Sequence, residues 1–414
     1  MGACDKSTMD AITENDDLLA LEAELVRRAH ALGPRFRERA AATEQNRALL
    51  KETMQDLFEA RLLRYFQPRR HGGFELEWGA QYAIGRAVAH YCPSTAWIVA
   101  VVGAHASFLS RMKPEVQDEV WGPNQDQLIA TGSVTKRGGA RRVPGGLQAS
   151  VQVGFSSGCD HAEWAMFGVK VEGAHDHYQI VVPRKDWQIA DTWHVAGMRG
   201  TGTKDLVLED VFVPEHRTLS VHDWINANPP GAKANPGYIS HVEFMPFVGT
   251  SLLGPMVGAA EGALNGYVET TRSRRGVMFG EQVADSATVQ LRLAESSAEL
   301  SAADVVIRDQ IAYLRHVGHS GETVPAEKRL SMNRDRAFAG RLCLSATERL
   351  TAQMGALGLF DSNPVQRHFR DVNAIATQIG INWDRNMAPY AKWLLGLPTG
   401  DPKIDGENRQ KAPE

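Results

Sequence analysis

Apolar residues recur every three or four positions between residues 12 and 64, with charged residues among them. This spacing predicts amphipathic helices. We expect a break at Gly33-Pro34, because a proline inside a helix lacks the amide hydrogen and clashes with the preceding turn. Farther along, the pattern predicts a helix over 77–91. A second, almost wholly apolar and therefore buried helix is expected over 95–109, after Cys92-Pro93-Ser94.

From Gln127 the period changes to alternation, which is typical of strands. The β-rich zone runs from about residue 127 to residue 220, and its clearest strands are expected at 128–133, 147–153, 163–171, 177–182 and 206–213. Residues 221–240 are rich in proline and asparagine, so we interpret them as a connecting loop that can cover a site.

Helical periodicity returns at Ser251 and predicts a bundle of four long helices, over 252–272, 288–316, 326–354 and 363–381. The first of these has glycines at four-residue steps, which permit close helix contacts. Its polar positions, among them Glu261 and Glu269, argue against a membrane span. The fold class is therefore α+β. We expect an N-terminal helical domain (1–126), a central β-barrel-like domain (127–235), a C-terminal four-helix bundle (236–395) and a polar tail (396–414).

Composition narrows the class of protein. The hydrophobic fraction is 43% and the charged fraction 23%, ordinary values for a globular protein, and the net charge is −4. Without a basic run, neither nucleic acid nor an anionic membrane is an expected partner. The four cysteines have no paired spacing, so we expect reduced thiols in a cytoplasmic protein and no metal site.

A glycine loop at 197–203, Gly-Met-Arg-Gly-Thr-Gly-Thr, leads into the strand ending Leu-Glu-Asp-Val-Phe-Val-Pro at 208–214. Its amides and the hydroxyls of Thr201 and Thr203 can lie against a flat polar ligand, although an ordinary hairpin has the same pattern. This stretch resembles the middle β-domain of the acyl-CoA dehydrogenase superfamily. The order of helices, β-domain and four-helix bundle is also similar to that superfamily, which implies a flavin nearby.

Three shorter motifs resemble one branch of this superfamily, the two-component flavin-dependent monooxygenases. They are Pro-Ser-Thr-Ala-Trp at 93–97, Gly-Ala-His at 103–105 and Gly-Phe-Ser-Ser-Gly-Cys-Asp-His at 154–161. The resemblance implies an oxygenase component that takes reduced FAD or FMN from a separate flavin reductase. It would hydroxylate a small aromatic substrate with O2 through a C4a-hydroperoxyflavin. A separate reductase is also expected because no nicotinamide-binding glycine motif opens a βαβ unit.

The same resemblance assigns site residues. The flavin ring is expected to be lined by Trp97, Thr131, Gly132, Ser133 and Phe155, with Ser156 and Ser157 placed near flavin N5 and His105 bonding a phenolate or the peroxide. From the residues alone, other interpretations stay open. The two serines can bond a turn backbone, and Trp97 and His105 can be core residues of an apolar helix.

Two motifs in the bundle resemble sites where these proteins contact the cofactor of a neighbouring subunit. In Arg-Ser-Arg-Arg-Gly at 272–276, Arg275 would meet the flavin pyrophosphate, although a solvated basic helix end has the same composition. In the Gln-Met-Gly-Ala-Leu-Gly turn at 353–358, Gly355 and Ala356 would let that cofactor approach the backbone. A homotetramer, or at least a dimer, is therefore expected.

One position departs from the family pattern. After the Arg-Asp pair at 370–371, the place of the usual catalytic histidine holds Gln378, and the resemblance implies that Gln378 and Ile379 contact the cofactor. A glutamine donates and accepts hydrogen bonds but takes no proton at neutral pH. His368 lies ten residues before Gln378. Because this spacing is not a whole number of helical turns, the His368 side chain should face in another direction. Either the substrate needs no strong base, or His105 serves alone.

Other functions stay open on this sequence. An acyl-CoA dehydrogenase needs a carboxylate base, and Glu261, Glu269 and Asp361 stand in no convincing base motif. A flavin-binding relative without turnover and a nitrogen-oxidising relative are further alternatives. Candidate substrate-lining residues suggest a flat apolar, even polycyclic molecule; they are Trp193, Trp224, Tyr238, Phe244, Met245 and Phe247.

Overall fold

The computed structural model describes residues 6–132, 134–276, 280–401 and 404–406, with the side chains of 6–16 excepted. The N-terminal part is helical, with α1 (Lys6–Asn46), α2 (Lys51–Glu59), α3 (Ala80–Ala89), α4 (Pro93–Leu109) and α5 (Pro114–Trp121). The expected break at Gly33-Pro34 was wrong, because α1 runs on through Pro34. The glycine serves packing instead: a Cβ at Gly33 would lie 2.3 Å from the Tyr91 ring.

The β-domain consists of two four-stranded sheets, ordered β1-β4-β5-β8 and β2-β3-β7-β6. The strands are β1 (Ile129–Gly132), β2 (Val134–Val143), β3 (Gly146–Ser156), β4 (Trp164–Lys170), β5 (His177–Pro183), β6 (Gln188–Ala190), β7 (Lys204–Pro214) and β8 (Thr218–Ser220). Among the strand pairs of the described residues, β1 with β4 is parallel and the others are antiparallel. The short strands β6 and β8 and most of β2 were not predicted, since they lack an apolar alternation.

The helices of the C-terminal part are α6 (Val221–Ile225), α7 (Phe244–Val248), α8 (Leu253–Ser273), α9 (Ala287–Ser320), α10 (Ala326–Met354), α11 (Pro364–Ala376) and α12 (Trp383–Leu394). The four predicted long helices are present as α8 to α11. However, α11 ends at Ala376, five residues before the expected end at Ile381, and α12 was not predicted.

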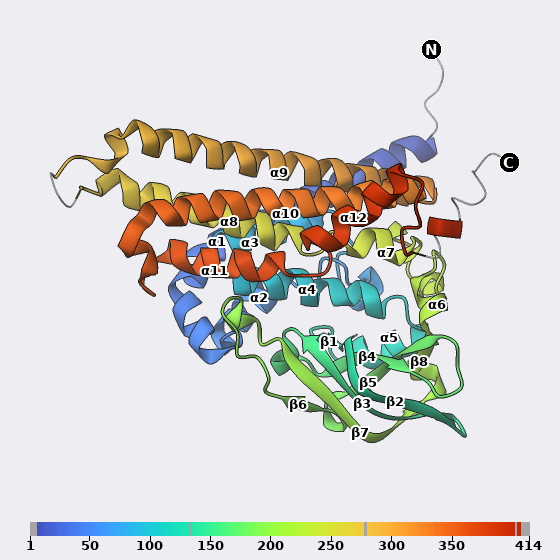
Figure 1. Cartoon of the computed structure of the whole chain (residues 1–414). Coiled ribbons are helices and arrows are strands. Elements are labelled where there is room, and N and C mark those ends of the chain that lie inside the picture. The colour runs from blue at the N-terminus through green and yellow to red at the C-terminus, as the bar shows by residue number, and fades with distance from the viewer. Residues whose placement is uncertain (1–5, 133, 277–279, 402–403, 407–414) are drawn as a thin grey trace, which may run out of the picture.

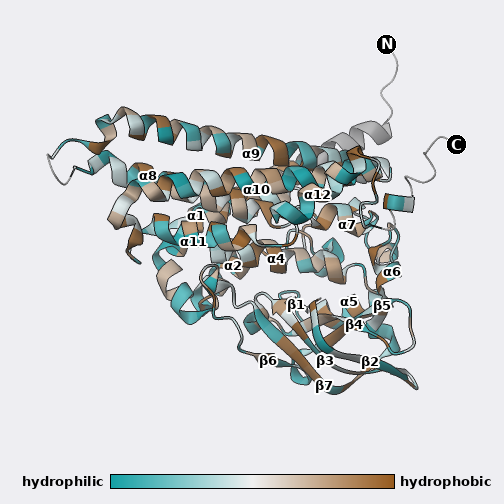
Figure 2. Cartoon of the chain, viewed as in Figure 1, coloured by the Kyte–Doolittle hydropathy of each residue, from teal (hydrophilic) through white to brown (hydrophobic). Residues whose placement is uncertain are grey.

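Helix α8 is long and largely apolar, with polar residues interspersed (Figure 2). By length and composition the run Phe244–Ser273 can cross a membrane, but 72% of its most apolar window is buried inside the fold. Two of its glycines explain the burial. A Cβ at Gly254 would lie 2.5 Å from the Tyr82 carbonyl oxygen, and one at Gly258 would lie 2.2 Å from that of Arg86. Helix α8 is therefore a core helix pressed against the backbone of α3.

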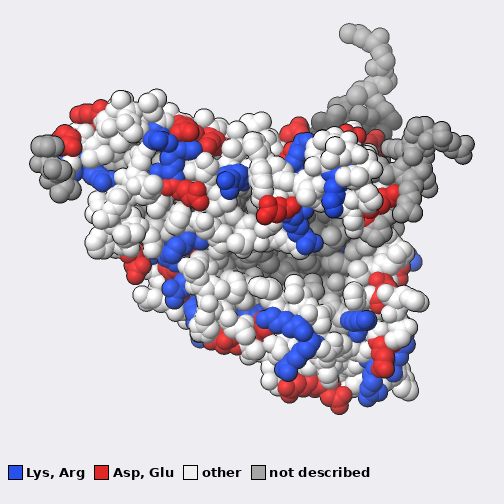
Figure 3. Space-filling model, in the orientation of Figure 1, with Lys and Arg blue, Asp and Glu red and all other residues white. Residues whose placement is uncertain are grey.

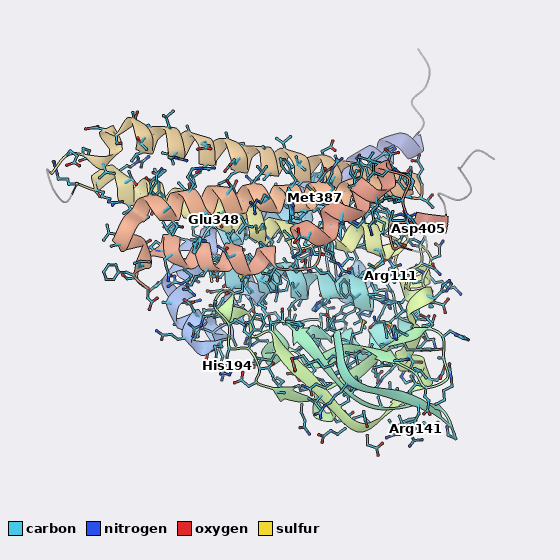
Figure 4. All side chains as sticks on the ribbon, in the orientation of Figure 1. Arg111, Arg141, His194, Glu348, Met387 and Asp405 are labelled. Atoms are coloured by element: carbon cyan, nitrogen blue, oxygen red, sulfur yellow. The ribbon has the colours of Figure 1, made fainter. Side chains whose placement is uncertain are left out.

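The segment 221–240, expected as a loop, is pinned to the protein rather than loose. The buried guanidinium of Arg111 donates hydrogen bonds to the carbonyl oxygens of Trp224, Asn226 and Val242. Figure 4 shows Arg111 between the end of α4 and the chain around α6. The Asn235 amide adds bonds to the carbonyl oxygens of Ser110 and Gly231. These contacts hold the segment in place against the end of α4 and the residues that follow it.

Helix α4 is the element that joins the two halves of the molecule. It packs on α3 and α8 on one side and on β1 of the β-domain on the other. In Figure 1 it lies between the long helices and the sheets. Figure 3 shows a hollow in the surface of this face between the helical bundle and the β-domain. Side chains of α4 that point toward the β-domain are therefore placed at the boundary of the two halves.

Candidate functional site

Helix α4 brings Trp97 and His105 to the β-domain. The indole nitrogen of Trp97 donates to Ser157 Oγ at 3.0 Å, just beyond the end of β3. His105 contacts β1, with Nδ1 2.6 Å from the Ile129 carbonyl oxygen and Nε2 2.9 Å from Thr131 Oγ1. The eight residues that separate the two side chains correspond to just over two helical turns, so both lie on related faces. The structure thus places two pairs of predicted site residues along α4: Trp97 with Ser157, and His105 with Thr131.

The partners of His105 fix its tautomer. A carbonyl oxygen only accepts, so Nδ1 carries the hydrogen and Nε2 is the acceptor for the Thr131 hydroxyl. The ring is 3% exposed, and burial lowers the pKa of His105 to about 4. At neutral pH this histidine is therefore an uncharged hydrogen-bond acceptor.

The glycine loop at 197–203 supplies two hydroxyls to the same place. Ser157 Oγ is 2.8 Å from Thr203 Oγ1, which is 2.6 Å from Thr201 Oγ1, and Thr201 Oγ1 donates to the Met198 carbonyl oxygen at 2.9 Å. We call Trp97, Ser157, Thr203 and Thr201 the hydroxyl cluster. All three hydroxyl-bearing residues are buried. That this loop lies against a ligand stays a prediction.

The turn at the end of β3 has the properties of a binding surface. Phe155 has a positive φ of 62° and a side chain that is 61% exposed, which is unusual for a large apolar residue. The next hydroxyl, Ser156 Oγ, is fully buried and has no hydrogen-bond partner among the described atoms. An exposed aromatic ring beside an unsatisfied buried hydroxyl fits a flat ligand with polar edge atoms, such as a flavin ring.

Gly132 and Ser133 follow Thr131 at the end of β1. A Cβ at Gly132 would lie 2.2 Å from Val153 Cγ2, so only glycine lets β1 and β3 approach this closely. Ser133 lies outside the described residues.

Helix α11 holds the start of the glycine loop. The amide of Met198, a residue with φ of 54°, donates to Asp371 Oδ1 at 2.5 Å. A Cβ at Gly197 would lie 2.1 Å from the Arg370 carbonyl oxygen. Asp371 is 2% exposed, and burial raises its pKa to about 7. The sequence motif contained Asp371, but its role in holding the loop depends on a contact across 173 residues and was missed.

Gln378 lies in the turn after α11, not in the helix. Its side-chain oxygen accepts from the Gly380 amide at 2.6 Å, and a Cβ at Gly380 would lie 3.7 Å from the Gly249 carbonyl oxygen. The spacing argument against His368 assumed that Gln378 belongs to the same helix, so it did not apply. The His368 side chain nevertheless faces in another direction, as expected. His368 is inside the bundle, and burial lowers its pKa to about 3. Ile379 is 55% exposed.

The predicted pyrophosphate contacts lie elsewhere. Arg275, Gly355 and Ala356 are exposed at the end of the bundle where α8 and α10 finish, away from the β-domain in Figure 1. Arg274 joins the two motifs by donating to the Gln353 carbonyl oxygen at 3.0 Å. Within one chain, these residues are not brought together with the hydroxyl cluster. We call Gly355–Leu359 the bundle-end turn.

The candidate substrate-lining residues divide into two groups. Trp224 and Phe244 pack on Phe108, whose ring centroid is 5.2 Å from that of His105. Tyr238 and Phe247 instead belong to a core around Trp78. Met245 is exposed, and the indole nitrogen of Trp193 bonds the Met198 carbonyl oxygen. Trp224 and Phe244 thus lie one aromatic layer behind His105.

The carboxylates considered for a dehydrogenase base are poorly placed for that role. Burial raises the pKa of Glu261, but hydrogen bonds from Arg86 and His90 outweigh it and lower the pKa to about 2. Glu269 is exposed and faces Arg37, and Asp361 is exposed in the turn before α11. A base that holds its charge in an ion pair down to acidic pH is weak in proton abstraction.

The fold and this site define a flavoprotein of the acyl-CoA dehydrogenase architecture. The family model for the acyl-CoA dehydrogenase C-terminal domain matches residues 251–383. The oxygenase subunit HsaA of a flavin-dependent monooxygenase from Rhodococcus jostii is 33% identical over 92% of this chain and 100% of its own length. The oxygenase component of an FADH2-dependent resorcinol hydroxylase from a Rhizobium species is 32% identical, over 90% and 94%.

Solved structures of monooxygenases have the same fold as this chain. The crystal structure of 3-HSA hydroxylase from Rhodococcus sp. RHA1 matches with a TM-score of 0.85 and 33% identity, covering 91% of this chain and 97% of that one. XiaF from a Streptomyces species, in complex with FADH2 and glycerol, matches with a TM-score of 0.86 and 27% identity, covering 94% and 98%. The chain belongs to the family of flavin-dependent monooxygenase oxygenase components, and is an oxidoreductase that uses reduced flavin and O2.

Proposed function

We propose that this oxygenase component hydroxylates a flat aromatic small molecule beside the Thr131–His105 pair. The observation that carries the proposal is the combination at one boundary of a neutral, buried histidine, an unsatisfied buried Ser156 hydroxyl and an exposed Phe155 ring. Relatives are named for activity on 3-HSA, resorcinol and p-hydroxyphenylacetate, all aromatic molecules.

Several residues are suited to hold the flavin. The exposed Phe155 ring would pack on the flat ring system, and the close approach at Gly132 would bring β-domain backbone to it. Ser156 and Ser157 would face its N5 edge. When bound, reduced FAD or FMN supplies the electrons that activate O2. The chain's own contribution is to orient the ring and to keep water from it, since Ser156, Ser157 and Thr203 are all buried.

The Thr131–His105 pair can bind a substrate hydroxyl and accept its proton transiently. The Thr131 hydroxyl hydrogen points to Nε2, so the oxygen keeps lone pairs for a phenol O–H. Proton movement from the phenol to Thr131 can be matched by movement from Thr131 to Nε2. With a pKa of about 4, His105 is a strong enough acceptor to orient the phenol but does not store the proton at neutral pH.

Gln378 takes a different role from the histidine that the family has at this position. Its oxygen is engaged by the Gly380 amide, so the groups it can offer a substrate are N–H donors. It can hold a ring oxygen or carbonyl of the substrate but cannot remove a proton.

We further propose a homo-oligomer, a tetramer or at least a dimer, in which the bundle-end turn contacts the cofactor of a neighbouring subunit. In and beside that turn, Leu357, Leu359 and Phe360 are exposed by 45%, 79% and 59%. Apolar side chains grouped on a surface mark an interaction site. A cytoplasmic location is proposed because Cys92, Cys159 and Cys343 are buried, unpaired thiols.

The test is oxygen uptake with an added flavin reductase across a panel of phenols and quinones, with mass analysis of products. We expect substrate-dependent oxygen uptake and a product heavier by one oxygen atom. Bleaching of the flavin by an acyl-CoA without oxygen transfer would instead indicate a dehydrogenase.

A further inference from the structure

The hydroxyl cluster has a fixed direction of hydrogen bonding. Thr201 can only donate to the Met198 carbonyl oxygen, because a carbonyl has no hydrogen. The single hydroxyl hydrogen of Thr201 is therefore used, and the 2.6 Å bond between Thr201 and Thr203 must be donated by Thr203. By the same count, the 2.8 Å bond between Ser157 and Thr203 must be donated by Ser157.

The other end of the cluster agrees with this direction. The indole N–H of Trp97 is a donor only, so Ser157 Oγ accepts it at 3.0 Å. Ser157 has then committed its hydrogen to Thr203 and one lone pair to Trp97. What remains for a ligand is one lone pair and no hydrogen. Ser156, buried without a partner, can turn to donate or to accept, so it suits either redox state of a flavin and the discrimination falls to Ser157.

A flavin presents opposite hydrogen-bonding groups at N5 in its two redox states. Oxidised flavin has a bare nitrogen that only accepts, whereas reduced flavin has an N–H that donates. A residue that can only accept is matched to the reduced form. Facing oxidised flavin, it would set two lone pairs against each other in a buried site, where a mismatch costs more than in water.

We propose that the polarity of the hydroxyl cluster makes the chain select reduced over oxidised flavin, with Thr201 and Thr203 as the positioning residues that set it. The inference rests on the proposed function, in which Ser157 lies at the N5 edge. It assigns the discrimination to residues that need not touch the flavin, because they act only through the direction of the Ser157 hydroxyl.

Two valine variants should change this polarity by different amounts. Thr203→Val removes the acceptor of the Ser157 hydrogen, so Ser157 can then donate or accept. Thr201→Val lets Thr203 turn and donate to Ser157, whose two lone pairs are then filled by Trp97 and Thr203, leaving only its hydrogen. Thr203→Ser keeps the hydroxyl and the wild-type direction. Trp97→Phe removes a donor and leaves Ser157 an acceptor.

The experiment is anaerobic titration with oxidised and with reduced FAD and FMN, comparing the ratio of the two Kd values. Wild type, Thr203→Ser and Trp97→Phe should prefer reduced flavin. Thr203→Val should bind oxidised flavin roughly fivefold more tightly relative to reduced flavin, as expected for one hydrogen bond. Thr201→Val should shift the ratio further, because it also weakens reduced-flavin binding.

The midpoint potential of the bound flavin gives a second readout that does not depend on activity. A fivefold fall in the preference for reduced flavin lowers that potential by about 20 mV for a two-electron couple. Equal weakening of both flavins in the valine variants, or a lost preference in Trp97→Phe, would overturn the proposal while leaving the proposed function intact. If the wild-type protein bound neither flavin, both this proposal and the proposed function would be wrong. Thermal unfolding of each variant checks that it folds.

Discussion

The hydroxyl cluster and the bundle-end turn both match cofactor motifs of the family, yet they differ in how far one chain completes them. Around the hydroxyl cluster, the polar atoms are buried and bonded to α4, the glycine loop and each other. At the bundle-end turn, Gly355 and Ala356 are exposed beside the apolar Leu359. One chain thus satisfies the polar atoms of the hydroxyl cluster, whereas it leaves the bundle-end turn uncovered.

The exposed bundle-end turn therefore supports the proposal that this motif works in an assembly of subunits. A buried region has to pair most of its polar atoms to be stable. Its structure therefore already reveals the direction of its hydrogen bonds and the charge state of its groups. An exposed turn has no such requirement, and its function depends on what covers it. Changes in the two regions should therefore have different consequences.

The largest stability effect should come from Asp371, which ties the glycine loop to α11. Burial raises its pKa from 3.8 to about 7, so the folded protein binds this proton more tightly than the unfolded chain. Stability is then lost as pH rises between those two values. From pH 5 to pH 8 the loss attributable to Asp371 should be about 2–3 kcal/mol.

Asp371→Asn should remove that dependence, because an amide oxygen still accepts from the Met198 amide but does not ionise. Urea unfolding at the two pH values measures it. An Asp371→Asn protein that loses as much stability as wild type between pH 5 and pH 8 would show that another group titrates.

His105→Gln should lower coupled hydroxylation by roughly 100-fold, the size expected for loss of a positioned proton acceptor. The glutamine can still bond Thr131 but cannot receive its proton. The matched control is His216→Gln, on a residue that is exposed and contacts Glu119. Product formation per flavin oxidised is the measurement, and equal yields in the two variants would remove His105 from the site.

Gly197→Ala should destabilise the protein by about 2 kcal/mol, because its methyl group would meet the Arg370 carbonyl oxygen at 2.1 Å. Gly406→Ala, where nothing lies within 4 Å, is the control. Thermal unfolding of both variants tests whether α11 presses on the glycine loop as closely as described. Equal melting temperatures would mean that the loop can move away at little cost.

The smallest effect on folding is expected at the bundle-end turn. Leu359→Ser should change the stability of the subunit by no more than about 0.5 kcal/mol, since the side chain is 79% exposed. The same change should weaken the oligomer, while Val305→Ser, 66% exposed in the middle of α9, should not. Sedimentation at several concentrations gives the mass. An unchanged oligomer in Leu359→Ser would place the interface elsewhere.

Periodicity was sufficient for the long helices and the main strands because burial of one face determines them, but it missed α12. It failed at Gly33-Pro34, where packing of α1 against Tyr91 outweighs the local cost of proline. It also failed at Gln378, because helix ends depend on the chain that follows.

For the site, the motifs predicted Trp97, His105, Ser156 and Ser157, and the fold brings Trp97 to Ser157 and His105 to Thr131. They gave neither the tautomer of His105 nor the direction of the hydroxyl cluster. Both properties come from pairs such as Ser157–Thr203, separated by 46 residues, that only the folded chain brings into contact.

The most direct test of the central claim is a single turnover of flavin-reduced enzyme with ¹⁸O2 and an accepted phenol. The fraction of flavin oxidation that yields labelled product rather than peroxide is then measured. Wild type should place label in the product, and Ser156→Ala, Ser157→Ala and His105→Gln should each release more peroxide and less product. Unchanged product yield and peroxide release in all three variants would contradict the assignment of this site.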